Sequence, residues 1–316
     1  MSTLEQAASV APNGAASEPA LAHISVCVCT YKRPQMLRRL LMEVIRQETG
    51  GLFTFSIVVT DNDEARSAEE TVAEIGRASS IPVKYCVETR QNIALARNKV
   101  VANAEGDYLA FIDDDEFPAR QWLLHLFNTC NTCNVDGVLG PVKRHFDQTP
   151  PRWLEKSQFY ERRVNPTGMP VEWLEARTGN VLLKREMVAG DPAPFRPEFR
   201  AGEDQDFFRR KMEEGRRFVW CAEAEAFESV PPVRWKRTYL LRKGLLRGAT
   251  AALQPNGFSS IAKSVVAVPL YTLALLPALL LGQHRFMTLL VKLCDHVGKL
   301  LMLMGINPIR GEYIAE

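Results

Sequence analysis

Tyr108-Leu109-Ala110-Phe111-Ile112-Asp113-Asp114-Asp115-Glu116 is the stretch that decides the fold of this 316-residue chain. Its first five residues are mostly apolar, which is typical of a short strand buried inside a sheet. Four carboxylates follow at the carboxyl end of the strand, where open α/β sheets bind their ligands. Because carboxylates this close repel one another, the pattern favours a site for a divalent cation with oxygen ligands. The alternative interpretation is a solvated acidic turn that caps the next helix.

Alternating strands and helices surround this stretch. We predict strands at 24–30, 55–59, 83–88 and 108–112, with helices between them that include Leu37, Glu69 and Ile93. Strands that alternate with helical segments of about ten residues indicate a mostly parallel sheet flanked by helices. Three of the strands end in polar or acidic residues, so we expect a site at one edge of the sheet.

The phosphate-binding glycines of common nucleotide sites are missing. The chain has no G-x-G-x-x-G motif after its first strand and no P-loop motif. It therefore lacks the glycines that hold phosphates in dinucleotide-binding and P-loop proteins. A phosphate must be held in another way, and a metal ion on Asp115 would do this.

Composition sets further limits. The chain is 46% apolar and has a formal net charge of +2, which supports a core and gives no global argument for binding nucleic acid. The seven cysteines indicate a reducing compartment, and the lone CxxC at Cys130 and Cys133 is not expected to bind zinc. Residues 1–22 read as a flexible leader without the basic start and apolar core of a secretory signal, so we expect the site to stay in the cytosol.

Seven segments stand out in order along the chain: VCVCTYKRP, IVVTDND, QNIALARN, GDYLAFIDDDEFP, ARTGNVLLKR, AGEDQDFFRR and WCAEAEAFESVPPVRW. Together they resemble the nucleotide-sugar glycosyltransferases of family 2, which have the GT-A fold. More narrowly, they resemble the succinoglycan-type glucosyltransferases of bacterial exopolysaccharide synthesis. The resemblance implies a GT-A catalytic domain at 23–232, with a donor half at 23–118 and an acceptor half at 119–232. Membrane-associated helices are then expected at 233–316.

The resemblance implies a donor site at the strand ends. Thr30 and Tyr31 are similar to the loop that packs on the uracil of a UDP-sugar, where a Tyr ring can stack on the base. A strand-capping Thr and a partly buried Tyr are the alternative. Asp61 resembles the acid that accepts the imide N–H of the base, and Asp63 is a second candidate that otherwise closes the turn. Arg97 is similar to an Arg near the donor and is equally consistent with a surface cation.

Asp113-Asp114-Asp115 resembles the DxD motif of the family. The resemblance implies that Asp115, together with Asp113, holds Mg²⁺ or Mn²⁺ bridging both phosphates, while Asp113 and Asp114 steady the ribose and the waters of the metal. The chemistry agrees, because breaking the anomeric C–O bond leaves negative charge on UDP that a Lewis acid stabilises. Glu116 stands where many relatives have another Asp, and no direct role follows for it.

Two segments of the acceptor half resemble site elements of the family. Asp204 resembles the catalytic acid, and we expect it to take the proton from the acceptor hydroxyl in one inverting displacement. Glu203 is expected to bind an acceptor hydroxyl; the alternative for these acids is to offset the helix macrodipole. Gly179 and Asn180 resemble a turn beside the donor sugar, where the glycine allows close approach of a ligand, and an ordinary turn before a strand is the alternative.

The segment after residue 233 changes character. Six cations and no acid lie between Arg234 and Arg247, interleaved with Trp, Tyr and Leu, which suits an anionic membrane surface or a lipid-linked diphosphate. Residues 264–283 carry no charge and are long enough to cross a bilayer, although Pro269 and Pro277 predict a break or kink. Residues 286–306 have the period of an amphipathic helix at an interface, with a buried helical pair as the alternative.

The sequence therefore predicts an inverting, metal-dependent transferase. It would move a hexose, with glucose favoured, from a UDP-sugar to a lipid-linked saccharide at the cytoplasmic face of the bacterial inner membrane. One alternative is another metal-dependent nucleotide enzyme that transfers a phosphoryl or nucleotidyl group, although no phosphoryl nucleophile is evident. The other is a non-catalytic, membrane-bound protein that binds a saccharide or nucleotide.

Overall fold

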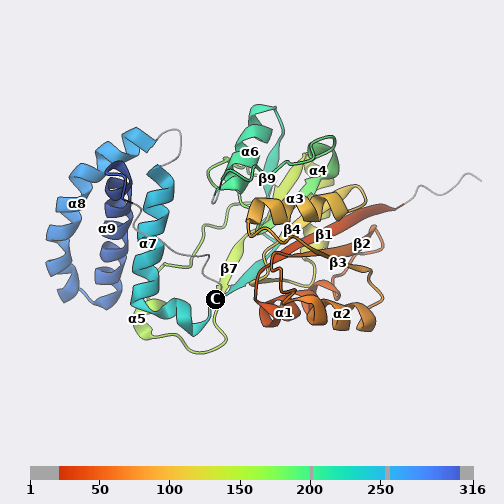
Figure 1. Ribbon diagram of the computed structural model, residues 1–316, viewed down its shortest axis with the longest axis horizontal. Coiled ribbons are helices and arrows are strands. Elements are labelled where there is room, and N and C mark those ends of the chain that lie inside the picture. Colours follow the sequence, from red (N-terminus) through yellow and green to blue (C-terminus); the bar gives the residue numbers. More distant parts are fainter. Residues whose placement is uncertain (1–20, 200–201, 253–256, 307–316) are drawn as a thin grey trace, which may run out of the picture.

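A computed structural model describes residues 21–199, 202–252 and 257–306, without the side chains of 257–261. The leader expected at 1–22 lies outside the described residues except for its last two, and Ala22 already begins the first strand. Figure 1 shows two parts side by side: a sheet flanked by helices, and a block of long helices from the C-terminal region.

The central sheet has seven strands in the order β3-β2-β1-β4-β8-β6-β9. Strands β1 to β4 are parallel, and β8 is inserted antiparallel between β4 and β6. The predicted α/β fold with a mostly parallel sheet is thus confirmed. The bounds are β1 Ala22–Thr30, β2 Phe53–Asp61, β3 Val83–Val87, β4 Tyr108–Ile112, β6 Gly137–Leu139, β8 Asn180–Lys184 and β9 Phe218–Trp220.

Helices cover both faces of this sheet. Successive strand residues point to opposite faces, so each face has apolar side chains that a layer of helices buries. Val26 and Val28 of β1 pack into one core cluster, whereas Cys27 between them packs into the other. The first cluster includes side chains of α1 (Pro34–Val44), α2 (Glu69–Ala78) and α4 (Trp122–Cys133). The second includes those of α3 (Ile93–Asn103) and α6 (Glu203–Glu213).

A second, three-stranded sheet in the order β5-β10-β7 was not predicted. The chain leaves the large sheet after β6 and enters the small one at β7. Gly140 and Pro141 separate the two: a Cβ at Gly140 would run into the carbonyl oxygen of Ala224, and Pro141 has no N–H for a ladder. The bounds are β5 Glu116–Pro118, β7 Val142–His145 and β10 Ala226–Ser229.

The region between β7 and β8 is loop-rich. It contains one short helix, α5 (Arg152–Glu155), and a 3-10 turn, η1 (Arg185–Met187), follows β8. A second 3-10 turn, η2 (Pro232–Trp235), leads from the small sheet into the C-terminal helices.

The C-terminal block consists of α7 (Arg237–Ala252), α8 (Gly257–Leu280) and α9 (Gln283–Leu303). Helix α9 lies between the other two and contacts both (Figure 1). Glycines let α7 and α9 approach closely. A Cβ at Gly244 would lie 2.9 Å from the carbonyl oxygen of Val291, and a Cβ at Gly248 or Gly298 would lie even closer to a carbonyl oxygen of the facing helix. Such close packing of small residues is typical of helices that associate in membranes.

Two expectations for this block change. Of the break or kink predicted at Pro269 and Pro277, the break is absent, because α8 continues as one helix through both prolines and packs along α9. The amphipathic helix α9 is packed between two helices, which is the alternative interpretation for that segment. It is α8 that carries the exposed apolar face, formed by Val265, Val266, Leu270, Leu273, Leu276 and Leu280. In the part of the chain that the structure describes, one stretch, Ala262–Leu280, is long and apolar enough to cross a membrane.

Candidate functional site

Polar side chains meet where β1, β2 and β4 end. Thr30 is the last residue of β1, Asp61 is the last of β2, and Asp113 directly follows β4. These strands are parallel neighbours, with β1 in the middle, so their carboxyl ends share one edge of the sheet. The structure therefore brings together the residues that the resemblance places around the donor.

Asp114 joins the end of β1 to the end of β4. Its buried carboxylate accepts hydrogen bonds from the Thr30 hydroxyl (2.8 Å) and from Nη1 of Arg33 (3.0 Å). Burial raises the pKa of Asp114 and the charge of Arg33 opposes this. The Thr30 hydroxyl is thus engaged within the protein, and the partly buried Tyr31 follows it.

Asp115 is held by two arginines. Its Oδ2 atom lies 2.8 Å from Nη2 of Arg234 and 3.5 Å from Nη1 of Arg33. Arg234 also pairs with Glu228 (3.1 Å), and Glu228 pairs in turn with Arg162 (3.0 Å). Asp115 is therefore paired with cations from two distant segments of the chain.

Sequence reasoning missed Arg33, Arg162 and Arg234 as site residues. The repulsion among the acids indicated that a counter-charge is needed, but it did not identify which cations supply it. Arg234 was grouped with the basic segment that follows it. In the structure its side chain is 6% exposed and turns toward Asp115.

Asp113 remains half exposed beside Arg97, with Oδ1 3.8 Å from Nη2 of the arginine. The surrounding protein desolvates the carboxylate and raises its pKa to about 7; Arg97 opposes the shift, and Asp115 and Asp114 add to it. Protonated and ionised forms of Asp113 are therefore close in free energy near neutral pH.

Arg97 is buried, so the alternative of a surface cation does not hold. Its guanidinium forms an ion pair with Glu203, which is buried at the start of α6. Burial raises the pKa of Glu203, and Arg97 lowers it. The pair links α3 to α6 and connects the expected acceptor side of the site with Asp113.

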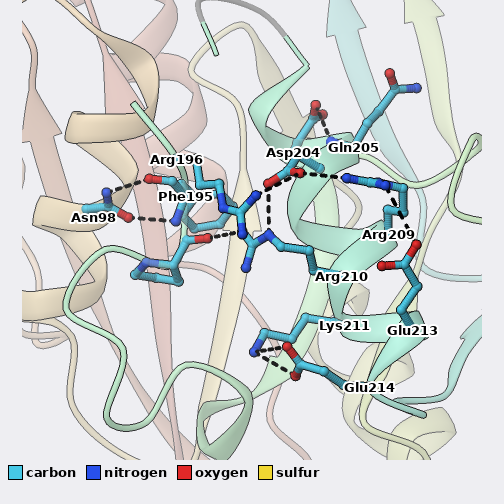
Figure 2. Close-up of polar contacts among 12 residues, drawn as sticks. Asn98, Phe195, Arg196, Asp204, Gln205, Arg209, Arg210, Lys211, Glu213 and Glu214 are labelled. Atoms are coloured by element: carbon cyan, nitrogen blue, oxygen red, sulfur yellow. Dashed lines mark hydrogen bonds and ion pairs between the residues drawn. The ribbon is translucent and has the colours of Figure 1, made fainter. Parts of the chain in front are cut away.

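The other acids of α6 have separate environments. Asp204 is partly exposed, and its Oδ1 accepts a hydrogen bond from the backbone N–H of Gln205 (2.8 Å). Asp206 is buried and pairs with Nε of Arg210 at 2.8 Å, and with Arg209 and Arg196 at longer distances. Figure 2 shows Arg196, Arg209 and Arg210 converging at the start of α6. Asp206 thus belongs to the structure of the helix start, and Asp204 is the more accessible acid.

Gly179 lies against the acidic cluster. A Cβ at this position would lie 2.8 Å from Oε1 of Glu116 and 3.1 Å from Oδ2 of Asp113. A larger residue here would displace the two carboxylates, an explanation for the glycine that differs from close approach of a ligand.

Asn180, expected in the acceptor site, has a structural role instead. Its side chain is buried, and its Nδ2 donates to the carbonyls of Pro141 (3.0 Å) and Ala224 (2.8 Å). Its Oδ1 accepts a hydrogen bond from the indole N–H of Trp122 (2.7 Å). The amide joins three segments of the protein and is fully used in doing so.

Glu116 is a buried acid with an incomplete set of partners. Burial raises its pKa well above the usual range, and the nearby charge of Asp113 adds to the shift. Its Oε2 has no hydrogen-bond partner among the residues that the structure describes. It also stands directly across from Glu228 in the β5–β10 pairing, where like charges repel.

Asp61 and Asp63 shape the loop after β2. Asp61 accepts hydrogen bonds from Ala68 N (2.8 Å), the Tyr85 hydroxyl (2.9 Å) and Asp63 N (3.1 Å), and burial raises its pKa. Asp63 accepts one from Ala65 N (3.2 Å), which is the turn-closing bond considered as its alternative role.

The carboxylates suit a metal ion that takes its remaining ligands from phosphate and water. No three His, Cys, Asp or Glu side chains in the described ranges form a group arranged for a metal ion. Asp113 and Asp115 nevertheless lie together at the end of β4. Mg²⁺ at phosphate sites uses one or two protein carboxylates and takes its remaining ligands from phosphates and water. The donor set therefore suits a metal ion bound together with a diphosphate.

Comparison with known proteins adds independent findings. Residues 25–187 match the sequence pattern of Glycosyl transferase family 2. The succinoglycan biosynthesis protein ExoM of Rhizobium meliloti (strain 1021) is 33% identical over 235 residues, which are 72% of this chain and 74% of that protein.

Two solved structures share the fold. Mannosyltransferase PcManGT from Pyrobaculum calidifontis, in complex with GDP-Man and Mn²⁺, gives a TM-score of 0.58 at 16% identity over 89% of this chain and 87% of its own. S. aureus TarS 1-349 in complex with UDP gives 0.52 at 16% identity over 93% of this chain and 95% of its own.

Proposed function

The chain belongs to glycosyltransferase family 2, and from this premise we propose that it transfers a hexose, with glucose favoured, from a UDP-sugar to a lipid-linked or polysaccharide acceptor in exopolysaccharide synthesis. One observation carries the proposal: carboxylates and guanidinium groups meet at the carboxyl edge of the sheet, where Arg33 and Arg234 contact Asp115. Such a mixed set suits a diphosphate with its divalent cation, because each charge finds an opposite partner.

The donor binds, in this proposal, across the ends of β1, β2 and β4. Tyr31 stacks on the uracil, and Asp61 and Asp63 present oxygens to the base from a loop held by internal hydrogen bonds. Thr30 supports this loop through Asp114, which also faces the ribose. Residues 23–118 form the donor half and residues 119–232 the acceptor half.

Asp113 and Asp115 would hold Mg²⁺ or Mn²⁺. When bound, the cation supplies Lewis-acid stabilisation of the charge that develops on the leaving diphosphate. Support comes from the position of both carboxylates at the strand end and from the nucleotide and Mn²⁺ in the structure that shares the fold.

Asp204 acts as the general base. Its exposed position at the start of α6 allows it to take the proton of an acceptor hydroxyl, whose oxygen attacks the anomeric carbon as the C–O bond to UDP breaks. One such displacement inverts the anomeric configuration. Glu203 and Arg97 form a buried pair beneath this position, so they fix the orientation of the acid relative to Asp113.

The C-terminal block holds the enzyme at a membrane. The face of α8 that points away from α9 exposes large apolar side chains, such as Leu273 (74% exposed) and Leu276 (77% exposed). An exposed apolar helix face of this length favours contact with the acyl boundary of a bilayer. The free thiols of all seven cysteines suit the cytoplasmic face of a bacterial inner membrane.

Product analysis tests the proposed reaction. With UDP-glucose, Mn²⁺ and a lipid-linked saccharide fraction as acceptor, we expect release of UDP and retention of the hexose in the lipid phase. Removal of the cation with EDTA should reduce both signals to background, and added Mn²⁺ should restore them. Release of pyrophosphate would instead indicate nucleotidyl transfer, and a protein that binds UDP without forming product would indicate a binding protein.

Vesicle flotation tests the membrane surface. The full chain should float with vesicles that contain phosphatidylglycerol, and Leu273→Gln combined with Leu276→Gln should reduce the floating fraction at least tenfold, since burying one Leu contributes about 1.5–3 kcal/mol. Leu52→Gln is the matched control, because Leu52 is 48% exposed but precedes β2, away from α8. A wild-type chain that stays with the unbound protein would contradict the proposal.

A further inference from the structure

Arg234 occupies the oxygen of Asp115 that faces the site. The contact of 2.8 Å between Nη2 and Oδ2 is a charge-assisted hydrogen bond, and Nη1 of Arg33 stands 3.5 Å from the same oxygen. Because a guanidinium and a divalent cation repel at such short range, the contact with Arg234 weakens binding of a metal ion at Asp115. The two cations compete for one carboxylate.

Both arginines have donors that the protein does not satisfy. Nε of Arg234 and Nε of Arg33 are buried and have no hydrogen-bond partner among the described residues. The residue Arg234 is only 5% exposed, so water does not readily replace the missing partner. An anion with several oxygens next to Asp115 would satisfy these donors, and a diphosphate presents such oxygens in the fork geometry that Arg prefers.

We propose that Arg234 couples binding of the nucleotide diphosphate to binding of the divalent cation by exchanging partners. Arg234 passes from Asp115 to a phosphate, and Asp115 passes from Arg234 to the cation, while Glu228 (3.1 Å from Nη1) anchors the guanidinium throughout. This inference rests on the proposed nucleotide-sugar site. Arg234 acts as a positioning residue, because without nucleotide it keeps the cation weakly bound.

The exchange predicts strong mutual dependence of the two ligands. The factor by which UDP tightens Mn²⁺ must equal the factor by which Mn²⁺ tightens UDP. In Arg234→Gln, no guanidinium competes with a metal ion for Asp115, and the phosphate loses a cationic partner. Mn²⁺ alone should then bind at least about tenfold more tightly, the equivalent of one charge-assisted hydrogen bond, and UDP with saturating Mn²⁺ should bind more weakly.

Calorimetric titration of the full chain measures four affinities. They are those for MnCl₂ alone, for UDP alone, for MnCl₂ in the presence of UDP, and for UDP in the presence of MnCl₂. Arg38→Gln is the control for net charge, since Arg38 pairs with Glu74 at the surface and with none of the acids that follow β4. It should leave the affinity for Mn²⁺ alone unchanged. Arg234→Lys keeps the positive charge with a single donor group. We expect its affinity for Mn²⁺ alone to lie between the affinities of the wild type and of Arg234→Gln. It takes the place of Arg234→Gln in the test if that variant does not fold.

Three outcomes would overturn the inference or its premise. If the wild-type chain binds UDP with Mn²⁺ but both Arg234 variants bind Mn²⁺ alone as the wild type does, the exchange is wrong. If Arg38→Gln tightens Mn²⁺ binding as much as Arg234→Gln does, the effect is only one of net charge and the exchange is also wrong. If the wild-type chain binds no UDP with Mn²⁺, the proposed function itself fails.

Discussion

Asp204→Asn should reduce the rate of sugar transfer by about 10²–10⁴-fold, the usual contribution of a general base. Asn has nearly the same shape and can still accept the hydrogen bond from Gln205 N–H, so the start of α6 should keep its conformation. It cannot take a proton from the acceptor. The turnover rate should therefore fall while the dissociation constant for UDP, measured by calorimetry, stays within about twofold of wild type.

Glu213→Gln is the control for this experiment. Glu213 lies on the same helix, is exposed, and pairs only loosely with Arg209 (3.7 Å). Its replacement should not change the turnover rate. An Asp204→Asn enzyme with near wild-type turnover would remove Asp204 from the catalytic role, and the neighbouring acids would then need the same test.

Breaking the Arg97–Glu203 pair should cause the largest loss of stability. Both side chains are buried, and removing one leaves the other charged in a desolvated place, which typically costs 3–5 kcal/mol. We expect Arg97→Met and Glu203→Gln each to lower the free energy of unfolding in urea by about this amount. The double variant Arg97→Met with Glu203→Met should recover much of the loss, because neither member of the buried pair is then left charged without the other.

A surface ion pair gives the comparison. Arg46 and Glu43 are both well exposed on α1 or its end, so Arg46→Met should change the free energy of unfolding by only about 0–1 kcal/mol. If Arg97→Met costs no more than Arg46→Met, or if the double variant is less stable than both single variants, the buried pair does not have the energetic role assigned to it.

The parallel strands β1 to β4 could be predicted from the sequence because their signals are local. The apolar runs that form β1, β2 and β4 are continuous, and the acids directly follow them, so strand type and site position can be inferred together. The small sheet gives no such signal, since β5 has three residues and β10 has four, with mixed polarity. Strands this short show no reliable period.

The remaining features depend on contacts between distant parts of the chain. The role of Asn180 follows from Trp122 and two carbonyls on other segments, and nothing near Asn180 in the sequence indicates them. The same holds for the arginines around Asp115. In the C-terminal region, hydropathy identified apolar helices, but only packing shows that α9 is covered and α8 is exposed.

The separation of Asp115 and Arg234 by 119 residues also bears on synthesis of the protein. A nascent chain that has left the ribosome as far as β5 carries all four acids, and Arg33 is the cation already in place for Asp114 and Asp115. Because a domain generally folds as a unit, the seven-stranded sheet is completed only after β9 has been made, and until Arg234 follows the acids lack one of their cations. Arg234 arrives just before α7, so the acidic edge reaches its final charge balance only as the helices of the C-terminal block begin to be made.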